Sequence, residues 1–175
     1  MVTPHIPQEE KPLEMRMAEA TILVMEIEGV LTDGRTLIDP QGQESIFISQ
    51  RDALALKMWM KDGYKVVLLA RTSLPAAAQW CQSNCIPFLA HQGAKNSALQ
   101  AIIFGNAALP KDVCYLGWDL EDLPPMMIAG ISACPANADS WVTGAAHLVL
   151  DAAAGQGVAR EMVDRLLAGR RPPAE

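Results

Sequence analysis

The sequence predicts an α/β protein in which a parallel β-sheet is covered by helices on both faces. Short apolar runs alternate along the chain with segments of helical character, which is the pattern of strands joined by crossover helices. These runs are almost continuously apolar, as expected of strands that are buried on both faces. The chain has 175 residues, of which 50% are hydrophobic and 19% charged. This length and composition suit one globular domain with a sizeable core.

Composition also excludes several classes of protein. The net charge of −6 argues against a nucleic-acid surface, and no apolar run reaches the ~18 residues that a membrane helix needs. The first residues are polar, contain Pro4, Pro7 and Pro12, and lack the apolar core of a signal peptide. We therefore expect a cytoplasmic protein that binds neither nucleic acid nor membrane. The predicted organisation is a flexible leader (1–18), a single domain (19–168) and a loose tail (169–175).

Cysteine and histidine do not indicate a zinc site. The four cysteines are Cys81, Cys85, Cys114 and Cys134, and no two of them form a Cys-x-x-Cys pair. We expect reduced, mostly buried thiols. The three histidines are scattered along the chain, and none is assigned a catalytic role.

The first predicted strand covers 21–27, and a β-hairpin follows it. Its two extended runs, 35–38 and 45–49, flank the sequence Asp39-Pro40-Gln41-Gly42, which favours a β-turn. A two-stranded hairpin is only marginally stable alone, so it is expected to pack on something, such as another subunit.

The remaining elements follow from capping residues and apolar runs. Asp52 is a candidate cap for a helix that ends before Gly63, and Ser73 is a candidate cap for a helix with Pro75 in its first turn. Further strands are predicted at 65–69, 86–90, 113–116, 131–133 and 147–150, and further helices at 95–104, 123–129 and 158–167.

Two carboxylates mark the end of the first strand. Glu26 and Glu28 are two residues apart, so on a strand their side chains would share one face. In open α/β sheets, ligands bind just beyond the carboxyl ends of the strands. The pair is therefore a candidate site, and the alternative interpretation is a strand end that turns into solvent.

The segment 26–34, Glu-Ile-Glu-Gly-Val-Leu-Thr-Asp-Gly, resembles the first motif of the haloacid dehalogenase (HAD) superfamily of phosphohydrolases. It most resembles the capless branch that contains 3-deoxy-D-manno-octulosonate 8-phosphate (KDO 8-phosphate) phosphatase. The resemblance covers about residues 20–168. It implies a three-layer, Rossmann-like HAD fold with a hairpin after the first strand and no cap domain.

In that family the first motif carries Asp at both acidic positions. The first Asp is the nucleophile and the second protonates the leaving alcohol, so the resemblance places Glu26 and Glu28 in these roles. Glu reaches about one C–C bond further than Asp, and a misplacement of ~1 Å can reduce a rate ~100-fold. The substitutions therefore disfavour the family's chemistry.

The phosphate-binding motifs are partly altered. Where the family has Thr-Gly-Arg, this chain has Ala70-Arg71-Thr72, so the hydroxyl is lost unless Thr72 supplies it, and Arg71 is a candidate anion ligand or a solvated surface residue. The family's phosphate-neutralising lysine is matched by Lys95 in Gln-Gly-Ala-Lys.

The family's metal motif has lost a ligand. The family reads Gly-Asp-Asp-x-x-Asp, and this chain reads Gly-Trp-Asp-Leu-Glu-Asp over 117–122. The resemblance implies Mg²⁺ held by the carboxylate at Glu26, the backbone carbonyl at Glu28 and a motif Asp, but Trp118 replaces that Asp. Asp119 is the candidate substitute. Mg²⁺ demands near-ideal octahedral oxygen coordination, and Trp118 is expected to be an apolar plug or a stacking surface for a ligand.

The framework motifs are intact. They are Arg51-Asp52, Leu123-Pro124, Ala133-Cys134-Pro135-Ala136 and Gly155-Gln156-Gly157-Val158-Ala159-Arg160-Glu161. Changes concentrated at the reacting positions predict a catalytically impaired phosphatase relative with a binding, scaffold or regulatory role, in which Lys95 pairs directly with Glu26 or Glu28.

Two alternatives remain open. One is a Mg²⁺-dependent phosphatase for a sugar-acid phosphate, and the other is an assembly partner of a sugar-acid cytidylyltransferase. The resemblance also implies a homotetramer formed through the hairpin (35–49) and the segment 155–160, with a small anionic sugar as ligand.

Overall fold

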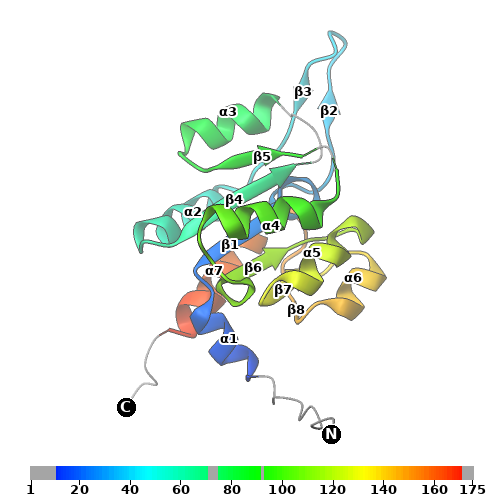
Figure 1. The fold of residues 1–175 in the computed structure, drawn as a ribbon. Helices are drawn as coiled ribbons and strands as arrows, with labels where there is room; N and C mark the ends of the chain where they lie inside the picture. Colours follow the sequence, from blue (N-terminus) through cyan, green and yellow to red (C-terminus); the bar gives the residue numbers. More distant parts are fainter. Residues whose placement is uncertain (1–10, 71–74, 92, 171–175) are drawn as a thin grey trace, which may run out of the picture.

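A computed structural model describes residues 11–70, 75–91 and 93–170. Its centre is a six-stranded sheet with the order β5-β4-β1-β6-β7-β8, and every neighbouring pair is parallel (Figure 1). The strands are β1 (Ile22–Glu26), β4 (Lys65–Ala70), β5 (Phe88–Ala90), β6 (Val113–Leu116), β7 (Ile131–Cys134) and β8 (Leu148–Val149). This confirms the predicted parallel sheet.

Strand β1 lies in the middle of the sheet and is buried along its whole length. Because side chains alternate between the faces of a strand, Leu23 and Met25 join one apolar cluster while Ile22 and Val24 join the other. Two cores, one on each face, explain why the strand is apolar at every position before Glu26.

Helices cover both faces of the sheet. Cluster membership places α2 (Gln50–Lys61), α3 (Pro75–Ser83) and α7 (Val158–Ala168) on one face, and α4 (Lys95–Gly105), α5 (Leu123–Ile128) and α6 (Ser140–Ala145) on the other. The three-layer fold is therefore as predicted, and no cap domain is present among the described residues. Helix α6 was not predicted; it begins where Asp139 accepts a hydrogen bond from Trp141 N at 2.8 Å.

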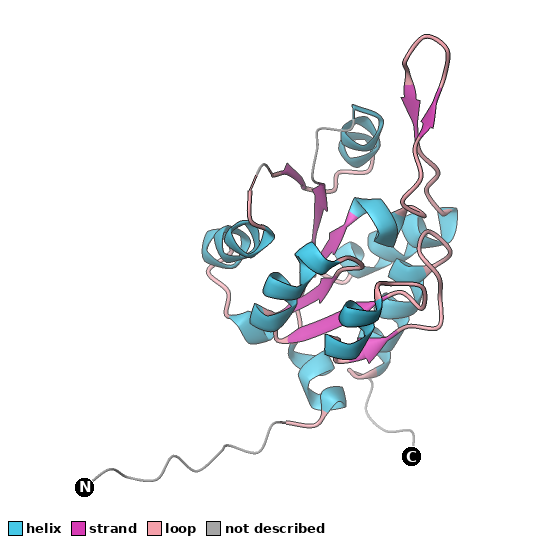
Figure 2. Ribbon diagram, turned by 90° about the vertical axis from the view of Figure 1, so that its right-hand side faces the viewer, coloured by secondary structure: helices cyan, strands magenta, loops and turns pink. Residues whose placement is uncertain are grey.

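A hairpin projects from the body of the molecule (Figure 2). Its strands β2 (Leu37–Ile38) and β3 (Glu44–Ser45) are antiparallel and shorter than predicted. Asp39 Oδ1 shapes the turn by accepting hydrogen bonds from the backbone of Gln41 and Gln43. On and beside the hairpin, Leu37, Ile38 and Phe47 are 59%, 62% and 75% exposed.

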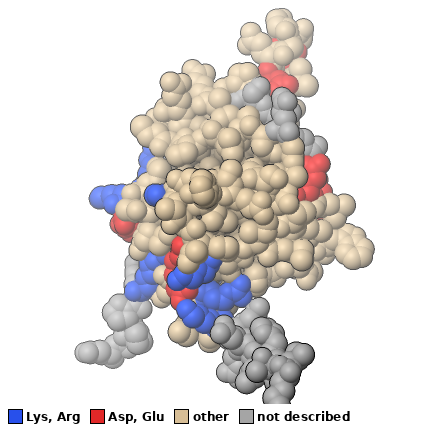
Figure 3. Space-filling view, viewed as in Figure 1, with Lys and Arg blue, Asp and Glu red and all other residues tan. Residues whose placement is uncertain are grey.

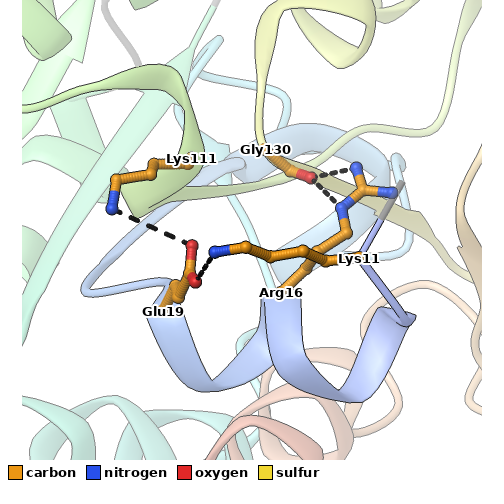
Figure 4. A pocket seen from close by; sticks show the side chains of 5 residues that line it. All are labelled: Lys11, Arg16, Glu19, Lys111 and Gly130. Atoms are coloured by element: carbon orange, nitrogen blue, oxygen red, sulfur yellow. Dashed lines mark hydrogen bonds and ion pairs between the residues drawn. The ribbon is translucent and has the colours of Figure 1, made fainter. Parts of the chain in front are cut away.

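The predicted flexible leader is wrong over its last residues, because α1 (Leu13–Glu19) is a helix docked on the domain. Arg16 Nε donates to the carbonyl of Gly130 at 3.1 Å, and Glu19 pairs with Lys11 and with Lys111 Nζ at 3.9 Å (Figure 4). These contacts lie at the end of the molecule where basic and acidic side chains gather (Figure 3). Long-range pairs of this kind leave no periodic signal in the sequence.

The first part of the predicted loose tail packs against the domain through Arg170. Arg170 lies over the rings of Trp59 and Tyr64, with its Cζ 4.9 and 4.4 Å from their centroids, and it donates to the Ala20 carbonyl. Residues 171–175 lie outside the described residues.

Asp52 does not cap its own helix. Ser49 occupies the N-cap position of α2, and Asp52 is fully buried in the first turn. Its Oδ2 accepts a hydrogen bond from Gly157 N at 3.1 Å and its Oδ1 accepts one from Arg160 N at 2.8 Å. Asp52 therefore caps α7, which is distant in sequence. Ser73, the other predicted cap, lies outside the described residues.

The cysteines match the prediction, since all four are free and Cys85 alone among them is exposed. Of the helices in the described part of the chain, none has the length and apolar character needed to cross a membrane.

Candidate functional site at the carboxyl ends of the central strands

The candidate site lies where β1 and the neighbouring strands β4 and β6 end. Glu26 is the last residue of β1 and is 2% exposed. The chain then turns sharply through residues 27–31, with Gly29 at φ +75°, and this turn contains Glu28. The strand therefore ends one residue earlier than predicted, and Glu28 lies in the turn rather than on the strand.

A buried lysine joins two buried carboxylates. Lys95, the first residue of α4, places its Nζ 3.2 Å from Glu26 Oε2 and 2.7 Å from Asp122 Oδ1. Lys95 is 6% exposed and Asp122 is fully buried. Of the two expected partners of Lys95, Glu26 and Glu28, the structure shows Glu26, and a second partner is Asp122.

Tyr115 completes this cluster from β6. Its hydroxyl is 2.8 Å from Asp122 Oδ1 and 3.4 Å from Glu26 Oε1. The other oxygen of Asp122 accepts hydrogen bonds from Trp118 N at 2.8 Å and Asp119 N at 3.1 Å. Sequence reasoning missed Tyr115, and the available signal was its phenolic oxygen, which needs a partner when buried.

Burial governs the electrostatics of the cluster. Burial raises the pKa of Glu26 to about 7, and the neighbouring Asp122 and Glu28 charges act in the same direction, while Lys95 opposes them. Burial lowers the pKa of Lys95, but Glu26 and Asp122 outweigh it, so that its pKa lies above the ordinary value. Lys95 is therefore charged near neutral pH, whereas Glu26 takes up a proton more readily than an exposed glutamate does, and a protonated carboxyl is a poor nucleophile.

Trp118 covers the turn that follows β1. A methyl group on Gly29 would lie 1.8 Å from Cδ2 of the indole, and one on Gly34 would lie 2.9 Å from its Cη2. The ring therefore lies directly on the backbone of both glycines, and it packs against the apolar core. We expected Trp118 to be an apolar plug or a stacking surface for a ligand. In the structure it contacts the turn after β1 and the apolar core.

The remaining predicted residues have separate positions. Ala70 ends β4 and is fully buried. Asp119 is the N-cap of the turn over Leu120–Asp122, since its Oδ1 accepts from Leu120 N. Arg71 and Thr72 lie outside the described residues. Among the described residues, no three His, Cys, Asp or Glu side chains are grouped so that they could hold a metal ion.

A cavity of about 440 Å³ opens beside Lys95. It is lined by His91, Gly93, Ala94, Lys95, Asn96, Glu121 and Pro124. Sequence reasoning assigned no role to His91. Its available signal was position, since it directly follows β5 at the same edge of the sheet as Glu26.

No family model matches the sequence, but individual proteins do. The chain is 28% identical over 169 residues to the KDO 8-phosphate phosphatase KdsC of Salmonella typhimurium, covering 95% of this chain and 85% of that protein. The cobalt-bound KDO 8-phosphate phosphatase of Haemophilus influenzae superimposes with a TM-score of 0.85 at 27% identity, covering 89% of this chain and 91% of that one.

The chain belongs to the HAD superfamily, and its homologues and structural neighbours include KDO 8-phosphate phosphatases. A further match, 29% identical over 148 residues, is the N-acylneuraminate cytidylyltransferase A of Danio rerio. The chain spans about a third of the length of the cytidylyltransferases that it matches, at 34% and 35%.

Two related structures contain a bound metal ion: the Haemophilus influenzae protein holds cobalt, and the Moraxella catarrhalis protein holds magnesium. The cluster in this chain differs from the family motif in both acids and in the first Asp of the metal motif. Family membership thus fixes the fold and the location of the site, whereas the chemistry depends on the residues present.

Proposed function

We propose that this protein is a non-hydrolytic member of the KDO 8-phosphate phosphatase family that binds a sugar acid without cleaving a phosphate ester. The observation that carries the proposal is the position of Lys95, whose ammonium group bridges Glu26 and Asp122 at 3.2 and 2.7 Å. One cation therefore already pairs with both carboxylates nearest to the reacting position.

The residues present do not fit a catalytic Mg²⁺ ion. The ion needs near-octahedral oxygen ligands at about 2.0–2.1 Å. An indole supplies none, and Trp118 lies on the turn at Gly29. Asp119, the candidate substitute, caps the adjacent turn with its Oδ1. The side chain of Glu26 is engaged by Lys95, so a metal would have to displace an ion pair that burial strengthens.

The nucleophile position is also unsuited to attack. Glu26 is 2% exposed, and burial raises its pKa to about 7. In-line attack on phosphorus needs an ionised carboxylate in contact with substrate. Ala70 offers no hydroxyl to a phosphate, so the site lacks a second element of transition-state binding.

Sugar acids are the proposed ligand class because both kinds of relative are named for them. KDO 8-phosphate is the substrate named for the Salmonella typhimurium phosphatase, and N-acylneuraminate is named for the Danio rerio cytidylyltransferase. The two sugars share a carboxylate and several hydroxyls. The cavity of about 440 Å³ beside Lys95 is of the size that small-molecule ligands occupy.

The deciding experiment measures phosphate release from KDO 8-phosphate and from p-nitrophenyl phosphate with Mg²⁺ present. The native protein is expected to release none above background. A matched variant restores the family residues through Glu26→Asp, Glu28→Asp, Ala70→Thr and Trp118→Asp, and phosphate release by this variant alone would support the proposal. Turnover by the native protein overturns it and favours a Mg²⁺-dependent phosphatase with substituted ligands.

We also propose that the protein is a homotetramer assembled through the hairpin and the segment 155–160. The support is the apolar surface of the hairpin region, where Leu37, Ile38 and Phe47 are more than half exposed. Light scattering on the native protein and on the Phe47→Glu variant tests this. A tetrameric mass that the variant lowers is expected, and a monomeric native mass at micromolar concentration contradicts it.

A further inference from the structure

The helices on the two sides of the sheet differ in charge. Helices α2 and α7 carry Lys, Arg, Asp and Glu along their length, whereas α4, α5 and α6 hold a single charged residue, Lys95, which is buried in its ion pairs. The sequence has no Lys, Arg, Asp or Glu over 96–110, 123–138 or 140–150. We call the outward surface of α4, α5 and α6 the uncharged face.

Large apolar side chains project from each helix of the uncharged face. Phe104 on α4, Met127 on α5 and Trp141 on α6 are 88%, 85% and 72% exposed, and α5 lies beside both of the other helices. A single exposed apolar residue is ordinary, but three of this size on adjoining helices form a patch of the kind that marks an interaction surface. Figure 3 shows the part of this face over α4 and α5, with the charged side chains gathered at the lower end and the edges of the molecule.

The composition of the uncharged face is that of an interface between identical chains. Homodimer interfaces are more apolar than transient ones, and their cores are rich in aromatic residues and Met and poor in Lys, Asp and Glu. Selection of a different partner commonly uses complementary charge, and the described residues of this face offer none. Since the chain has a net charge of −6, two copies repel each other least where no charged group has to be desolvated.

The size of the uncharged face also suits a pair. At about 150–250 Å² for each aromatic side chain, the exposed parts of Phe104 and Trp141 together with Met127 supply roughly 400–500 Å². Exposed neighbours such as Gln100 and Pro124 are uncharged and extend this area toward the about 800 Å² per partner of a stable interface.

We propose that two copies of this chain pair through the uncharged face, with α4 and α5 of one copy packed against the same helices of the other. A two-fold axis makes such a pair self-complementary, because the same patch is used by both copies. The hairpin projects from another part of the molecule (Figure 1), so this interface is separate from the proposed hairpin assembly and does not depend on it. If both form, the tetramer is a dimer of face-to-face pairs.

Analytical ultracentrifugation of the native protein and of charged variants tests the pairing. Phe104→Lys and Met127→Lys each place a like charge on both sides of the interface and should weaken pairing at least thirtyfold, as for loss of a central anchor. The mass at micromolar concentration should therefore fall by half. The same halving is expected when either substitution is added to Phe47→Glu, in which the hairpin assembly is weakened.

Two controls separate pairing from folding. Met15→Lys places the same charge on α1, outside the uncharged face, at a side chain that is 54% exposed, and it should leave the mass unchanged. Phe104→Leu keeps an apolar side chain and should retain the pair. Because Phe104 and Met127 lie near the ends of their helices, a lysine there is favourable to the helix dipole, and urea unfolding should show native stability.

A monomeric native mass, or an unchanged mass in both lysine variants, overturns the inference. Two other occupants of the face would also overturn it. Amide protection on α4 and α5 that persists on dilution to nanomolar concentration assigns the face to another segment of the same chain. Binding to phosphatidylcholine vesicles that Phe104→Lys abolishes, with no change of mass, assigns it to a membrane surface.

These results are separable from the tests of the proposed function. A mass halved by Phe104→Lys but unchanged by Phe47→Glu removes only the hairpin assembly. The reverse result removes only this inference. Phosphate release by the native protein bears on neither interface.

Discussion

Two buried carboxylates of this protein, Asp52 and Glu26, are held in different ways. Asp52 accepts hydrogen bonds from the backbone of Gly157 and Arg160, and it fixes the start of α7. Glu26 is held by the side chains of Lys95 and Tyr115. The first belongs to a framework motif that matches the family, and the second departs from it. Where the motif is kept, the acid stabilises the backbone, and where it has changed, the acid pairs with a buried lysine.

The largest expected effect comes from replacing Lys95, which holds Glu26 and Asp122. Lys95→Met leaves Glu26 and Asp122 buried without their shared cation, and breaking a buried ion pair in this way costs about 3–5 kcal/mol. The free energy of unfolding measured in urea at pH 7.5 should fall by that amount. Lys111→Met, which removes an exposed cation, serves as the control and should change it by less than about 1 kcal/mol.

Substitution of Gly29, in the turn that Trp118 covers, should destabilise the protein almost as much. Gly29→Ala places a methyl group into the indole and imposes φ +75° on a residue with a Cβ, for an expected loss of about 2–4 kcal/mol. Trp118→Ala should partly rescue it in a double-mutant cycle by removing the clash but not the backbone strain. Additive losses would show that the ring does not lie on this turn.

Asp52, the acid of the framework motif, should also contribute to stability, but less than Lys95 does. Asp52→Ala removes two hydrogen bonds to the start of α7 and leaves two backbone N–H groups unsatisfied, which should cost about 2–3 kcal/mol of unfolding free energy. Hydrogen exchange at the first turn of α7 should rise while the amides around Lys95 stay protected. Equal loss of protection at both places would contradict the separation of the two arrangements.

The pH dependence of stability should distinguish the two acids further. Because the pKa of Glu26 is about 7 in the folded protein and about 4.5 when exposed, the folded state binds the extra proton between these values. Stability therefore falls as pH rises from about 5 to 7.5, by about 2 kcal/mol from this group. Burial also raises the pKa of Asp52, which acts in the same direction at lower pH.

Glu26→Gln mimics the protonated side chain and isolates its contribution. The variant should match the native protein near pH 5 and exceed its stability at pH 7.5. Urea unfolding across this range measures both. A native stability that rises with pH over this window, unaffected by the substitution, would contradict the assigned environment of Glu26.

Sequence patterns predicted the sheet because its inner strands β1, β6 and β7 are buried along their whole length and are therefore mostly apolar. The family resemblance, rather than a sequence pattern, predicted that Lys95 pairs with Glu26 or Glu28, and Glu26 is the partner. The docking of α1 through Arg16 and Gly130, and the capping of α7 by Asp52, were not predictable, because both depend on partners more than 100 residues away. His91 escaped notice because an isolated histidine carries no local pattern.

The crystal structure of the native protein grown with Mg²⁺ and KDO tests the central claim most directly, because it shows which cation lies between Glu26 and Asp122. We predict that Lys95 Nζ stays within hydrogen-bond distance of both carboxylates and that no metal density appears between them. A Mg²⁺ ion coordinated by the Glu26 carboxylate and the Glu28 carbonyl, with Lys95 displaced, would contradict the account.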